Sequence, residues 1–400
     1  MPLLIRNATL DGRAVDCLID GGVYTAISPS LDAPHGAEVL DAGGDYIVPP
    51  FFNAHTHIPM NLFRGLADDI PLMPWLKEHI WPAEAKLTAA DIRRGARLAI
   101  DEMVRSGTVF FNDLYWHAGE VVEAAAEGGL RAAVGPCLVD EAPGVLAARS
   151  LEDLEDTRRR HAALPPEARR RIHLAYAPHA VYTVSGKSLE WIARRARDDD
   201  AFLHVHASET KVEFDDCLAA HGMTPVAWLD KCGALGPKTI LAHCVWLTDG
   251  DRELIAERGC TISHQPCSNA KLCSGAFDYR AAVERAGCRL AIGTDGCASN
   301  NNLSMFDEMK FAALNAKAAS GDPSCGKAAD IFRAATRGGA EAFGLDGGRI
   351  AVGALGDALL IRRDAAQMTP CTNLVSNLVY AADTSCVAAV VCDGKVLFTA

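Results

Sequence analysis

The chain has 400 residues, 49% of them hydrophobic and 22% charged, and its formal net charge is −12 at pH 7. This size and composition are typical of a globular enzyme with one large domain or two to three smaller ones. The acidic balance argues against nucleic acid or an anionic membrane as a partner, and no stretch approaches the roughly 18 apolar residues of a membrane helix.

Fourteen cysteines are scattered along the chain, and no two of them form a C-x-x-C pair. This spacing gives no support to a zinc ribbon or a thioredoxin-like site. The apolar run of the N-terminal segment MPLLIRNATLDG is too short for a secretory signal. We therefore expect reduced, buried cysteines in a cytoplasmic protein.

Residues 1–48 contain short strand-like runs separated by turns, and short strands return beyond residue 350, in DALLIRR and VAAVVCDGKVLF. Between them, short β-branched runs alternate with segments that we expect to be helical, at 88–106, 118–128, 186–198 and 250–258. Alternation of this kind predicts βα units. We expect an α/β domain at 49–350, inserted into a small β-sandwich domain formed by 1–48 and 351–400.

Eight candidate strands lie in the central part, and helical patterns separate most of them. They are YIVPPFFNA, GTVFFND, RAAVGPCLV, RIHLAYAP, AFLHVHA, KTILAH, CTISH and RLAIGTD. Eight βα units in about 300 residues predict a (β/α)8 barrel of the TIM type. A doubly wound sheet is the alternative, but the chain lacks its glycine-rich phosphate loop.

Imidazole or carboxylate side chains stand at or near the end of each of these runs. In chain order they are His55 and His57, Asp113, Asp140, His179, His206, His243, His264 and Asp295. Barrel enzymes build their active sites on the face where the carboxyl ends of the strands meet. The pattern therefore predicts one site at the mouth of the barrel.

The segment NAHTH at 53–57 places His55 and His57 on one face of a strand, with Cα atoms roughly 6.6 Å apart. Both imidazoles can then reach one metal ion. A third imidazole and one carboxylate would complete a site with an open position for water. His206 in HVHASET and Asp295 in IGTDG are the candidates for these two ligands.

Other polar residues near the predicted mouth have less specific signals. His243 in LAHC is placed to polarise the water or a tetrahedral intermediate, and Glu209 can act there as general acid/base. Taken alone, His243 or His264 would more often be a core or surface histidine, and Asp113 is expected to be a structural hydrogen-bond acceptor. The remaining histidines are interpreted as ordinary ones: His117, His161, His173 and His221.

These motifs, in this order, resemble those of the amidohydrolase superfamily. The most similar branch is that of the adenosine-type deaminases of S-adenosylhomocysteine and methylthioadenosine, grouped with the triazine hydrolases. The resemblance covers nearly the whole chain, through VPPFFNAHTHIPMNLFRGLADDIPLMPWLKEHIWPAEAKLT, HVHASET, LAHCVWL, ISHQPCSNAKLCSG, IGTDGCASNNNLSMFDEMK and GALGDALLI. It implies one divalent ion, usually zinc, with iron and manganese as alternatives. The ligands implied are His55, His57, His206 and Asp295.

The same resemblance implies hydrolytic deamination at C6 of adenine. In the implied reaction Asp295 accepts a proton from water, His243 orients the resulting hydroxide, and Glu209 protonates the adjacent ring nitrogen. Asp295 then passes a proton to the departing ammonia. AYAPHA has His179 where a carbamylated lysine would bridge two metals, so a mononuclear site is implied.

Substrate contacts are implied for further residues. Glu84 in WPAEAKL matches a glutamate that binds ribose hydroxyls, and a carboxylate can accept two hydrogen bonds from a vicinal diol. His179 matches a histidine that contacts the nucleoside, and Trp75 or Trp81 is a candidate for stacking on the base, unless both belong to the core. Arg149 is the candidate contact for the carboxylate of S-adenosylhomocysteine. A second arginine common in that group is replaced here by Gly-Pro-Cys at 135–137, which favours smaller 5′-modified adenosines.

We therefore expect a metal-dependent deaminase of 5′-deoxyadenosine, methylthioadenosine, adenosine or S-adenosylhomocysteine. The alternatives are deamination of a free purine such as guanine or 8-oxoguanine, dechlorination of a triazine, or a non-catalytic metal-binding protein on the same fold. Glu84 discriminates among the enzymes, because a free base offers it no diol. The resemblance also implies a homo-oligomer.

Overall fold

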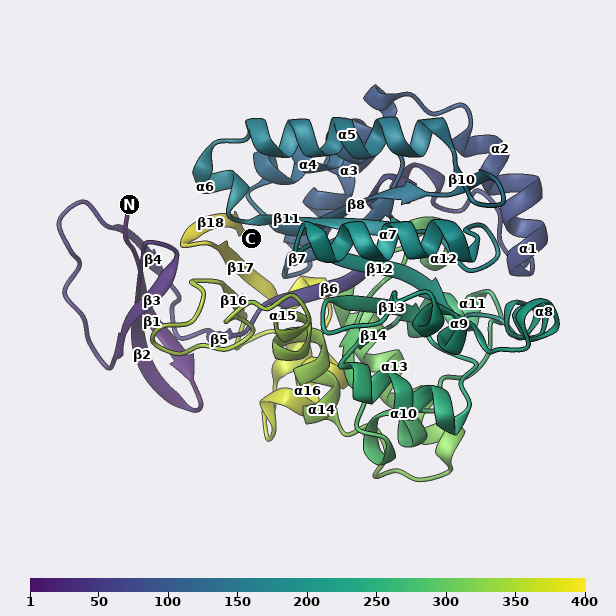
Figure 1. Cartoon of the computed structure of the whole chain (residues 1–400). Coiled ribbons are helices and arrows are strands. Elements are labelled where there is room, and N and C mark those ends of the chain that lie inside the picture. Colours follow the sequence, from purple (N-terminus) through teal and green to yellow (C-terminus); the bar gives the residue numbers. More distant parts are fainter.

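The computed structural model describes residues 1–400 and consists of a parallel barrel with a second sheet beside it (Figure 1). Eight parallel strands follow one another around the barrel in their order along the chain. They are β6 Phe51–Thr56, β7 Thr108–Tyr115, β8 Arg131–Leu138, β11 Ile172–Pro178, β12 Phe202–Ala207, β13 Thr239–His243, β14 Thr261–His264 and β15 Arg289–Ile292. Each of the eight predicted runs overlaps one of them, and β6 and β7 extend two residues beyond their runs, so the predicted (β/α)8 barrel is confirmed.

The barrel closes where the chain beyond β15 meets the first strand, β6. The carbonyl of His55 accepts hydrogen bonds from the backbone N–H groups of Thr294 at 3.1 Å and Asp295 at 3.0 Å. The Asn53 side chain crosses the same seam, donating to Thr294 Oγ1 at 2.8 Å and accepting from Thr294 N at 3.1 Å. A Cβ on Gly293 would lie 2.7 Å from the His55 nitrogen, so this approach requires glycine. The seam therefore holds NAHTH directly against Asp295.

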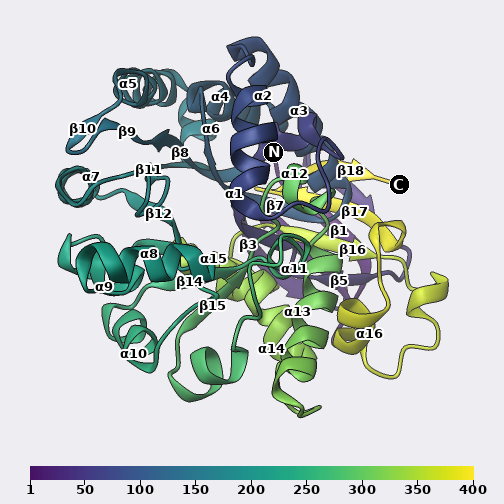
Figure 2. The same cartoon turned by 90° about the vertical axis from the view of Figure 1, so that its right-hand side faces the viewer.

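Helices cover the outside of the barrel (Figure 2). The four predicted helices are confirmed as α3 Ala89–Arg105, α4 Ala118–Gly128, α7 Gly186–Asp198 and α10 Asp249–Arg258. The others around the barrel are α5 Ala148–Ala163, α6 Pro166–Arg169, α8 Lys211–His221, α9 Pro225–Lys231, α11 Pro266–Lys271, α12 Cys297–Asn300, α13 Met305–Ser320, α14 Ala328–Arg333 and α15 Gly339–Ala342. Apolar residues three and four positions apart give helices such as α3 a buried face.

Two short segments extend from the carboxyl ends of the strands. Between β6 and α3 the chain forms a 3-10 turn at Ile58–Phe63, α1 Leu72–Pro74, a π turn at Trp75–Ile80 and α2 Trp81–Glu84. After β8 it forms a hairpin of β9 Asp140–Ala142 and β10 Val145–Leu146. In Figure 2 the helices α1 and α2 face the viewer.

The two ends of the chain form the second sheet. Its strands are β1 Leu3–Leu10, β2 Arg13–Asp20, β3 Val23–Ser28, β4 Glu38–Asp41, β5 Tyr46–Val48, β16 Ala358–Ile361, β17 Val387–Cys392 and β18 Lys395–Thr399. Strand β5 joins the two ends, because it pairs with β1 on one side and with β16 on the other. Residues from both ends share a small core, so the predicted β unit is confirmed. We propose 1–48, 49–350 and 351–400 as the boundaries of the corresponding domains.

Two local expectations were wrong. The run YIVPPFFNA is two strands, β5 in the end sheet and β6 in the barrel, since Pro49 and Pro50 have no N–H to donate to a ladder. The C-terminal part also contains α16 Leu374–Tyr380 and two 3-10 turns between β16 and β17, where only strands were expected. Leu378 and Val379 of α16 are buried.

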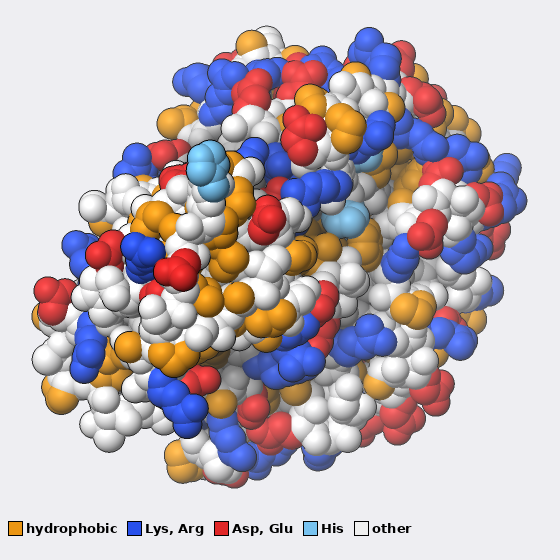
Figure 3. Space-filling model, turned by 90° about the vertical axis from the view of Figure 1, so that its left-hand side faces the viewer, with side chains coloured by type: hydrophobic (Ala, Val, Ile, Leu, Met, Phe, Trp, Pro, Cys, Tyr) orange, Lys and Arg blue, Asp and Glu red, His pale blue; other side chains and the backbone are white.

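The surface carries both signs of charge on the face that includes the end sheet, where basic and acidic side chains are interspersed (Figure 3). No helix is both long and apolar enough to cross a bilayer.

A buried ion cluster ties the end sheet to the barrel. Arg131, the first residue of β8, donates to Asp357 Oδ2 at 2.9 Å and Oδ1 at 3.1 Å, and to Asp393 Oδ1 at 3.3 Å. Asp357 precedes β16 and Asp393 lies in the turn between β17 and β18. All three side chains are at most 3% exposed. Removing this cation would leave the buried carboxylate of Asp357 without an ion-pair partner, whereas Asp393 would keep Arg170 and Arg171.

Replacement of Arg131 by Met is expected to lower the free energy of unfolding by about 3–5 kcal/mol, the usual cost of breaking a buried ion pair from one side. Urea unfolding monitored by circular dichroism measures this. The control is Arg94→Met, which removes an exposed ion pair with Asp91 and is expected to change stability by at most about 0.5 kcal/mol. An Arg131→Met protein as stable as the control would contradict the role given to the cluster.

Candidate active site

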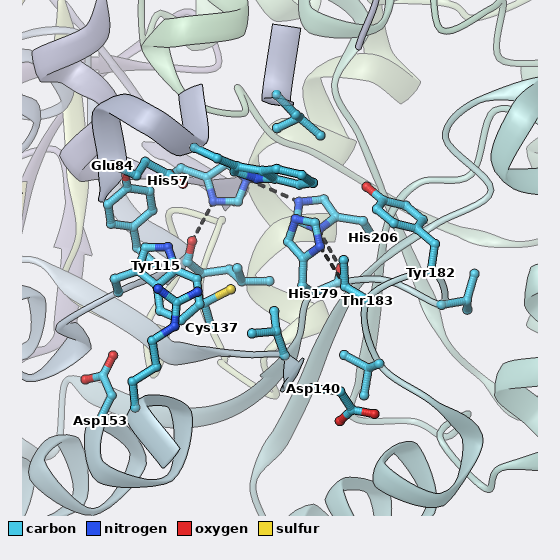
Figure 4. A pocket seen from close by; sticks show the side chains of 18 of the residues that line it. His57, Glu84, Tyr115, Cys137, Asp140, Asp153, His179, Tyr182, Thr183 and His206 are labelled. Carbon is cyan, nitrogen blue, oxygen red and sulfur yellow. Dashed lines mark hydrogen bonds between the residues drawn. The ribbon is translucent and has the colours of Figure 1, made fainter. Parts of the chain in front are cut away.

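One cavity of about 1100 Å³ lies at the carboxyl ends of the barrel strands (Figure 4). Almost every residue singled out from the sequence lines it: His57, Trp75, Trp81, Glu84, Arg149, His179, His206, Glu209, His243 and Asp295. His55 does not line it, because its side chain is 0% exposed and lies beneath the cavity floor, and Asp113 and His264 do not line it either. The structure thus brings most of the predicted strand-end residues together around one cavity.

At the floor of the cavity, imidazole nitrogens gather around one carboxylate. Asp295 Oδ1 lies 3.3 Å from His57 Nε2 and 3.6 Å from His55 Nε2. His206 Nε2 lies 3.2 Å from His57 Nε2. Two overlapping sets of donor atoms, one from His55, His206 and His243 and one from His55, His57 and Asp295, each lie within 4.8 Å of one another.

Backbone and amide oxygens fix the orientation of three of these rings. His57 Nδ1 lies 2.5 Å from the carbonyl oxygen of Leu114, and His206 Nδ1 lies 2.7 Å from that of His179. His243 Nδ1 lies 2.8 Å from Asn269 Oδ1. An oxygen of this kind can only accept a hydrogen bond, so each Nδ1 carries the proton. Each Nε2 therefore turns a lone pair toward the cavity floor.

His55 is held differently, by another histidine. Its Nδ1 lies 2.7 Å from Nε2 of His204, which sits on the same face of β12 as His206. His55 Nε2 is buried and has no hydrogen-bond partner. A buried nitrogen without a partner is costly unless something else satisfies it.

Burial keeps the imidazoles neutral and the surrounding imidazoles keep Asp295 charged. Burial lowers the pKa of His55 to about 3 and lowers those of His57 and His206 as well. Burial also disfavours the charged form of Asp295, but His55, His57 and His243 outweigh it and bring its pKa well below the ordinary range. The centre therefore offers neutral nitrogen ligands and an ionised carboxylate at neutral pH.

Asp295 and His243 have a strained backbone conformation. Asp295 follows the end of β15, and His243 is the last residue of β13. Their φ angles are 61° and 74°, in the left-handed region that non-glycine residues rarely adopt. Asp295 is held there by Ser268 Oγ, which donates to Oδ2 at 2.6 Å, and by the Gly296 N–H, which donates to Oδ1 at 2.8 Å. Strain of this kind is concentrated at functional sites in proteins.

Glu209 faces the same centre from the turn after β12. Its Oε2 lies 3.8 Å from His243 Nε2, and its Oε1 accepts a hydrogen bond from Ser274 Oγ at 3.0 Å. Burial raises the pKa of Glu209 above its ordinary value. For His243, burial favours the neutral ring, but the charges of Glu209 and Asp295 raise its pKa. The protonated forms of Glu209 and His243 are thus both favoured relative to the free side chains.

Glu84 lies at another part of the cavity, beside Tyr115 (Figure 4). Burial raises its pKa to about 7, although Tyr115, Trp116 and the charge of Arg149 act in the opposite direction. The guanidinium of Arg149 stacks 3.9 Å above the ring of Trp116. This corner combines an acceptor carboxylate with aromatic walls.

The other aromatic and histidine candidates line the cavity in different ways. Trp75 is 4% exposed and donates from Nε1 to Ala67 O at 3.1 Å, whereas Trp81 is half-buried. His179 Nδ1 lies 2.9 Å from Thr183 Oγ1, and burial lowers the pKa of the ring to about 4. A neutral His179 can offer its Nε2 to a ligand.

Three strand-end residues lie outside the centre. Asp113 accepts the Ile58 N–H at 2.7 Å and is fully buried, which confirms its structural role. Asp140 accepts the N–H and Oγ–H of Ser185 at 3.0 and 2.6 Å and fixes the start of α7. His264 does not line the cavity and packs on Phe277.

Two histidines interpreted as ordinary, His117 and His221, line the cavity. The run GTVFFND places the end of its strand at Asp113, but β7 continues to Tyr115. A strand extended by two residues would have brought His117 to the mouth of the barrel. No local signal marks His221, because it reaches the cavity from the far end of α8.

Comparison with known proteins places this geometry in a family. The family model described as the amidohydrolase family matches residues 46–397. The 5′-deoxyadenosine deaminase of Methanothermobacter thermautotrophicus is 41% identical over 385 residues, which cover 96% of this chain and 89% of that protein. The 5-methylthioadenosine/S-adenosylhomocysteine deaminase of Thermococcus kodakarensis is 38% identical over 403 residues, which cover 99% and 94%.

Solved structures agree with this assignment. An adenosine deaminase from Xanthomonas campestris with bound zinc superimposes with a TM-score of 0.89 at 36% identity, covering 99% of this chain and 92% of that one. An atrazine chlorohydrolase from Arthrobacter aurescens shares the fold, with a TM-score of 0.87 at 24% identity over 98% and 94%. The resemblance predicted from the motifs is confirmed for the superfamily and for its adenosine-type deaminase branch. The chain belongs to the amidohydrolase family.

Proposed function

We propose that the chain is a metal-dependent hydrolytic deaminase that converts an adenosine derivative to the inosine form and ammonia. The observation that carries this proposal is the convergence of His55, His57, His206 and Asp295 at the floor of a cavity that also contains Glu84. The relatives named above act on nucleosides of this class.

The donor set fits one divalent metal ion. His55, His57, His206 and Asp295 would hold it, since they offer neutral imidazole nitrogens and an ionised carboxylate, and the buried Nε2 of His55 has no other partner. Zinc suits this set, as do iron and manganese. Such an ion supplies one thing to the chemistry, a water whose pKa is brought towards neutrality.

The side chains around this centre divide the proton transfers among themselves. Asp295 accepts the proton of the attacking water, and His243, fixed by Asn269, orients that water with its Nε2. Glu209 gives a proton to the ring nitrogen next to C6, for which the raised pKa of its buried carboxyl group is suited. Asp295 returns its proton to the amine, the C6–N bond breaks and ammonia leaves, while the proton of the C6 hydroxyl group returns to Glu209 as the carbonyl forms.

The rest of the cavity is suited to a nucleoside. We propose that Glu84 accepts hydrogen bonds from the two ribose hydroxyls, that His179 contacts the nucleoside, and that Trp75 or Trp81 stacks on the base. Free guanine, 8-oxoguanine or a triazine offers the carboxylate of Glu84 no diol to bind. This disfavours those alternatives, and the complete set of proton-transfer groups disfavours a non-catalytic protein.

The wall around Gly135–Cys137 favours a small 5′ substituent. Of these three residues only Cys137 lines the cavity, and burial raises the pKa of its thiol, so this stretch offers a substrate no charged group. Arg149 is then the candidate partner for a substrate carboxylate. We propose 5′-deoxyadenosine, methylthioadenosine or adenosine as substrates ahead of S-adenosylhomocysteine.

A homo-oligomeric state and a cytoplasmic location, expected from the sequence, are part of the same proposal. All fourteen cysteines are free thiols, as a reducing compartment would keep them. Sedimentation of the purified protein measures the oligomeric state.

The zinc-loaded protein is expected to release ammonia from 5′-deoxyadenosine, and Asp295→Ala is expected to lower kcat by at least about 10²–10⁴-fold, the usual contribution of general acid–base catalysis. A coupled ammonia assay measures both. Asp346→Ala, which removes an exposed ion pair with Arg349, is the control and should keep full activity. A wild-type protein without activity on any 5′-substituted adenosine would refute the proposal.

Chelation is expected to abolish turnover, and zinc, added back at one equivalent, to restore it. His57→Ala and His206→Ala should each bind less than one equivalent by elemental analysis, because each removes one nitrogen of the donor set. His161→Ala, far from the donor set and hydrogen-bonded to Ile172 O, should still bind one. Full occupancy in both ligand variants would show that the ion binds elsewhere.

Glu84 should give the reaction a pH dependence of its own. Since its pKa is raised to about 7, the carboxylate is ionised above that pH and protonated below it, so kcat/KM for a ribonucleoside should fall as pH drops below about 7. Glu84→Gln should lower kcat/KM by about 10–100-fold through loss of charged hydrogen bonds. The fall of kcat/KM at low pH should disappear in this variant, and the metal should stay bound. A 2′,3′-dideoxy substrate should be insensitive to the substitution; equal losses on both substrates would exclude Glu84 from sugar binding.

A further inference from the structure

Glu213, in the first turn of α8, has a buried carboxylate that the proposed chemistry does not use. Its residue is 6% exposed. Oε1 accepts the backbone N–H of Ser208 at 3.1 Å and Oε2 accepts the backbone N–H of Glu209 at 2.7 Å. Both oxygens are therefore committed to the turn that carries Glu209.

This arrangement differs from an ordinary helix cap. In a capping box the third helical residue bonds to the N–H of the N-cap residue, as Asp91 does with Thr88 at 3.1 Å and Asp251 with Thr248 at 2.8 Å. Thr210 is the N-cap of α8, but Glu213 reaches past it to the two preceding residues. Glu213 therefore holds the turn after β12 and does not cap the end of the helix.

The turn itself has an uncommon shape that has to be held. Ser208 has a φ of 52°, in the left-handed region. Its carbonyl accepts the N–H groups of Val245 and Trp246, both at 2.9 Å, on the side opposite Glu213. Glu213 and the chain after β13 thus fix the same peptide from two directions.

We propose that Glu213 is a positioning residue whose two carboxylate oxygens fix the backbone of Glu209, so that the Glu209 carboxyl group faces the reacting ring nitrogen. This inference rests on the proton-transfer role of Glu209 given above. Fixing the backbone matters because Ser274 provides the one direct hydrogen bond to the Glu209 side chain. A displacement of about 1 Å at a catalytic group can cost about 10²-fold in rate.

The test is steady-state kinetics of Glu213→Ala and Glu213→Gln, each loaded with zinc and checked for folding by circular dichroism. Ala removes both acceptors, whereas Gln has a single oxygen and keeps one. With 5′-deoxyadenosine, kcat should fall about 10–100-fold for Ala and less for Gln. KM should stay within about threefold of the wild-type value, and each variant should still bind one equivalent of zinc, because neither substitution touches the sugar site or the metal site.

Asp91→Asn is the matched control, since it weakens the capping box of α3 on the outside of the barrel and should leave kcat unchanged. A purely structural role for Glu213 would lower the melting temperature, as in the control, but leave the kcat of the folded protein unchanged. A Glu213→Ala protein with wild-type kcat, or a Glu213→Gln protein with wild-type kcat if Ala does not fold, would overturn the inference. The inference would also be overturned if the activity were lost through a higher KM or through a lower zinc content.

Glu209→Gln separates this inference from the function on which it rests. If Glu209→Gln retains full turnover, the proposed proton transfer is wrong. If Glu209→Gln is inactive while the Glu213 variants are fully active, the proton transfer stands and the positioning role alone is wrong.

Discussion

The carbonyl of His55 accepts two backbone hydrogen bonds from Thr294 and Asp295, and the active site depends on this contact. It joins the first and last strands of the barrel at the level of the donor atoms. Side chains alternate along a strand, so a shift of one residue at this seam would turn the imidazoles or the carboxylate away from the cavity. Asn53 and Gly293 exclude such a shift, one by its hydrogen bonds and the other by its lack of a side chain.

Burial gives the charged groups around this seam opposite properties. Burial lowers the pKa of His55 and raises the pKa values of Glu209 and Glu84. The pKa of Asp295 is lowered instead, because His55, His57 and His243 outweigh the effect of burial. Two carboxyl groups of one site thereby differ in their affinity for a proton, one suited to donate and the other to accept. The division of labour proposed for Glu209 and Asp295 follows from where each side chain lies.

Much of the fold was predictable from the sequence because hydrophobic periodicity and strand-end residues are local signals. The eight barrel strands, four helices and the gathering of His55, His57, His206 and Asp295 were found this way. The division of YIVPPFFNA into two strands at Pro49 and Pro50 was missed, because an apolar run has the same pattern whether it lies in the end sheet or in the barrel. Glu213 and His221 were missed for another reason: each reaches the site from a helix, and their relevance depends on contacts with distant turns that no spacing in the sequence reveals.

The most direct test of the account is one crystal structure of the zinc-loaded protein with purine riboside, which lacks the leaving amine. We expect an anomalous zinc peak among His55, His57, His206 and Asp295. We also expect the ribose hydroxyls at the carboxylate of Glu84 and the purine C6 over the metal centre. A zinc peak elsewhere, or a riboside bound with its sugar away from Glu84, would contradict it.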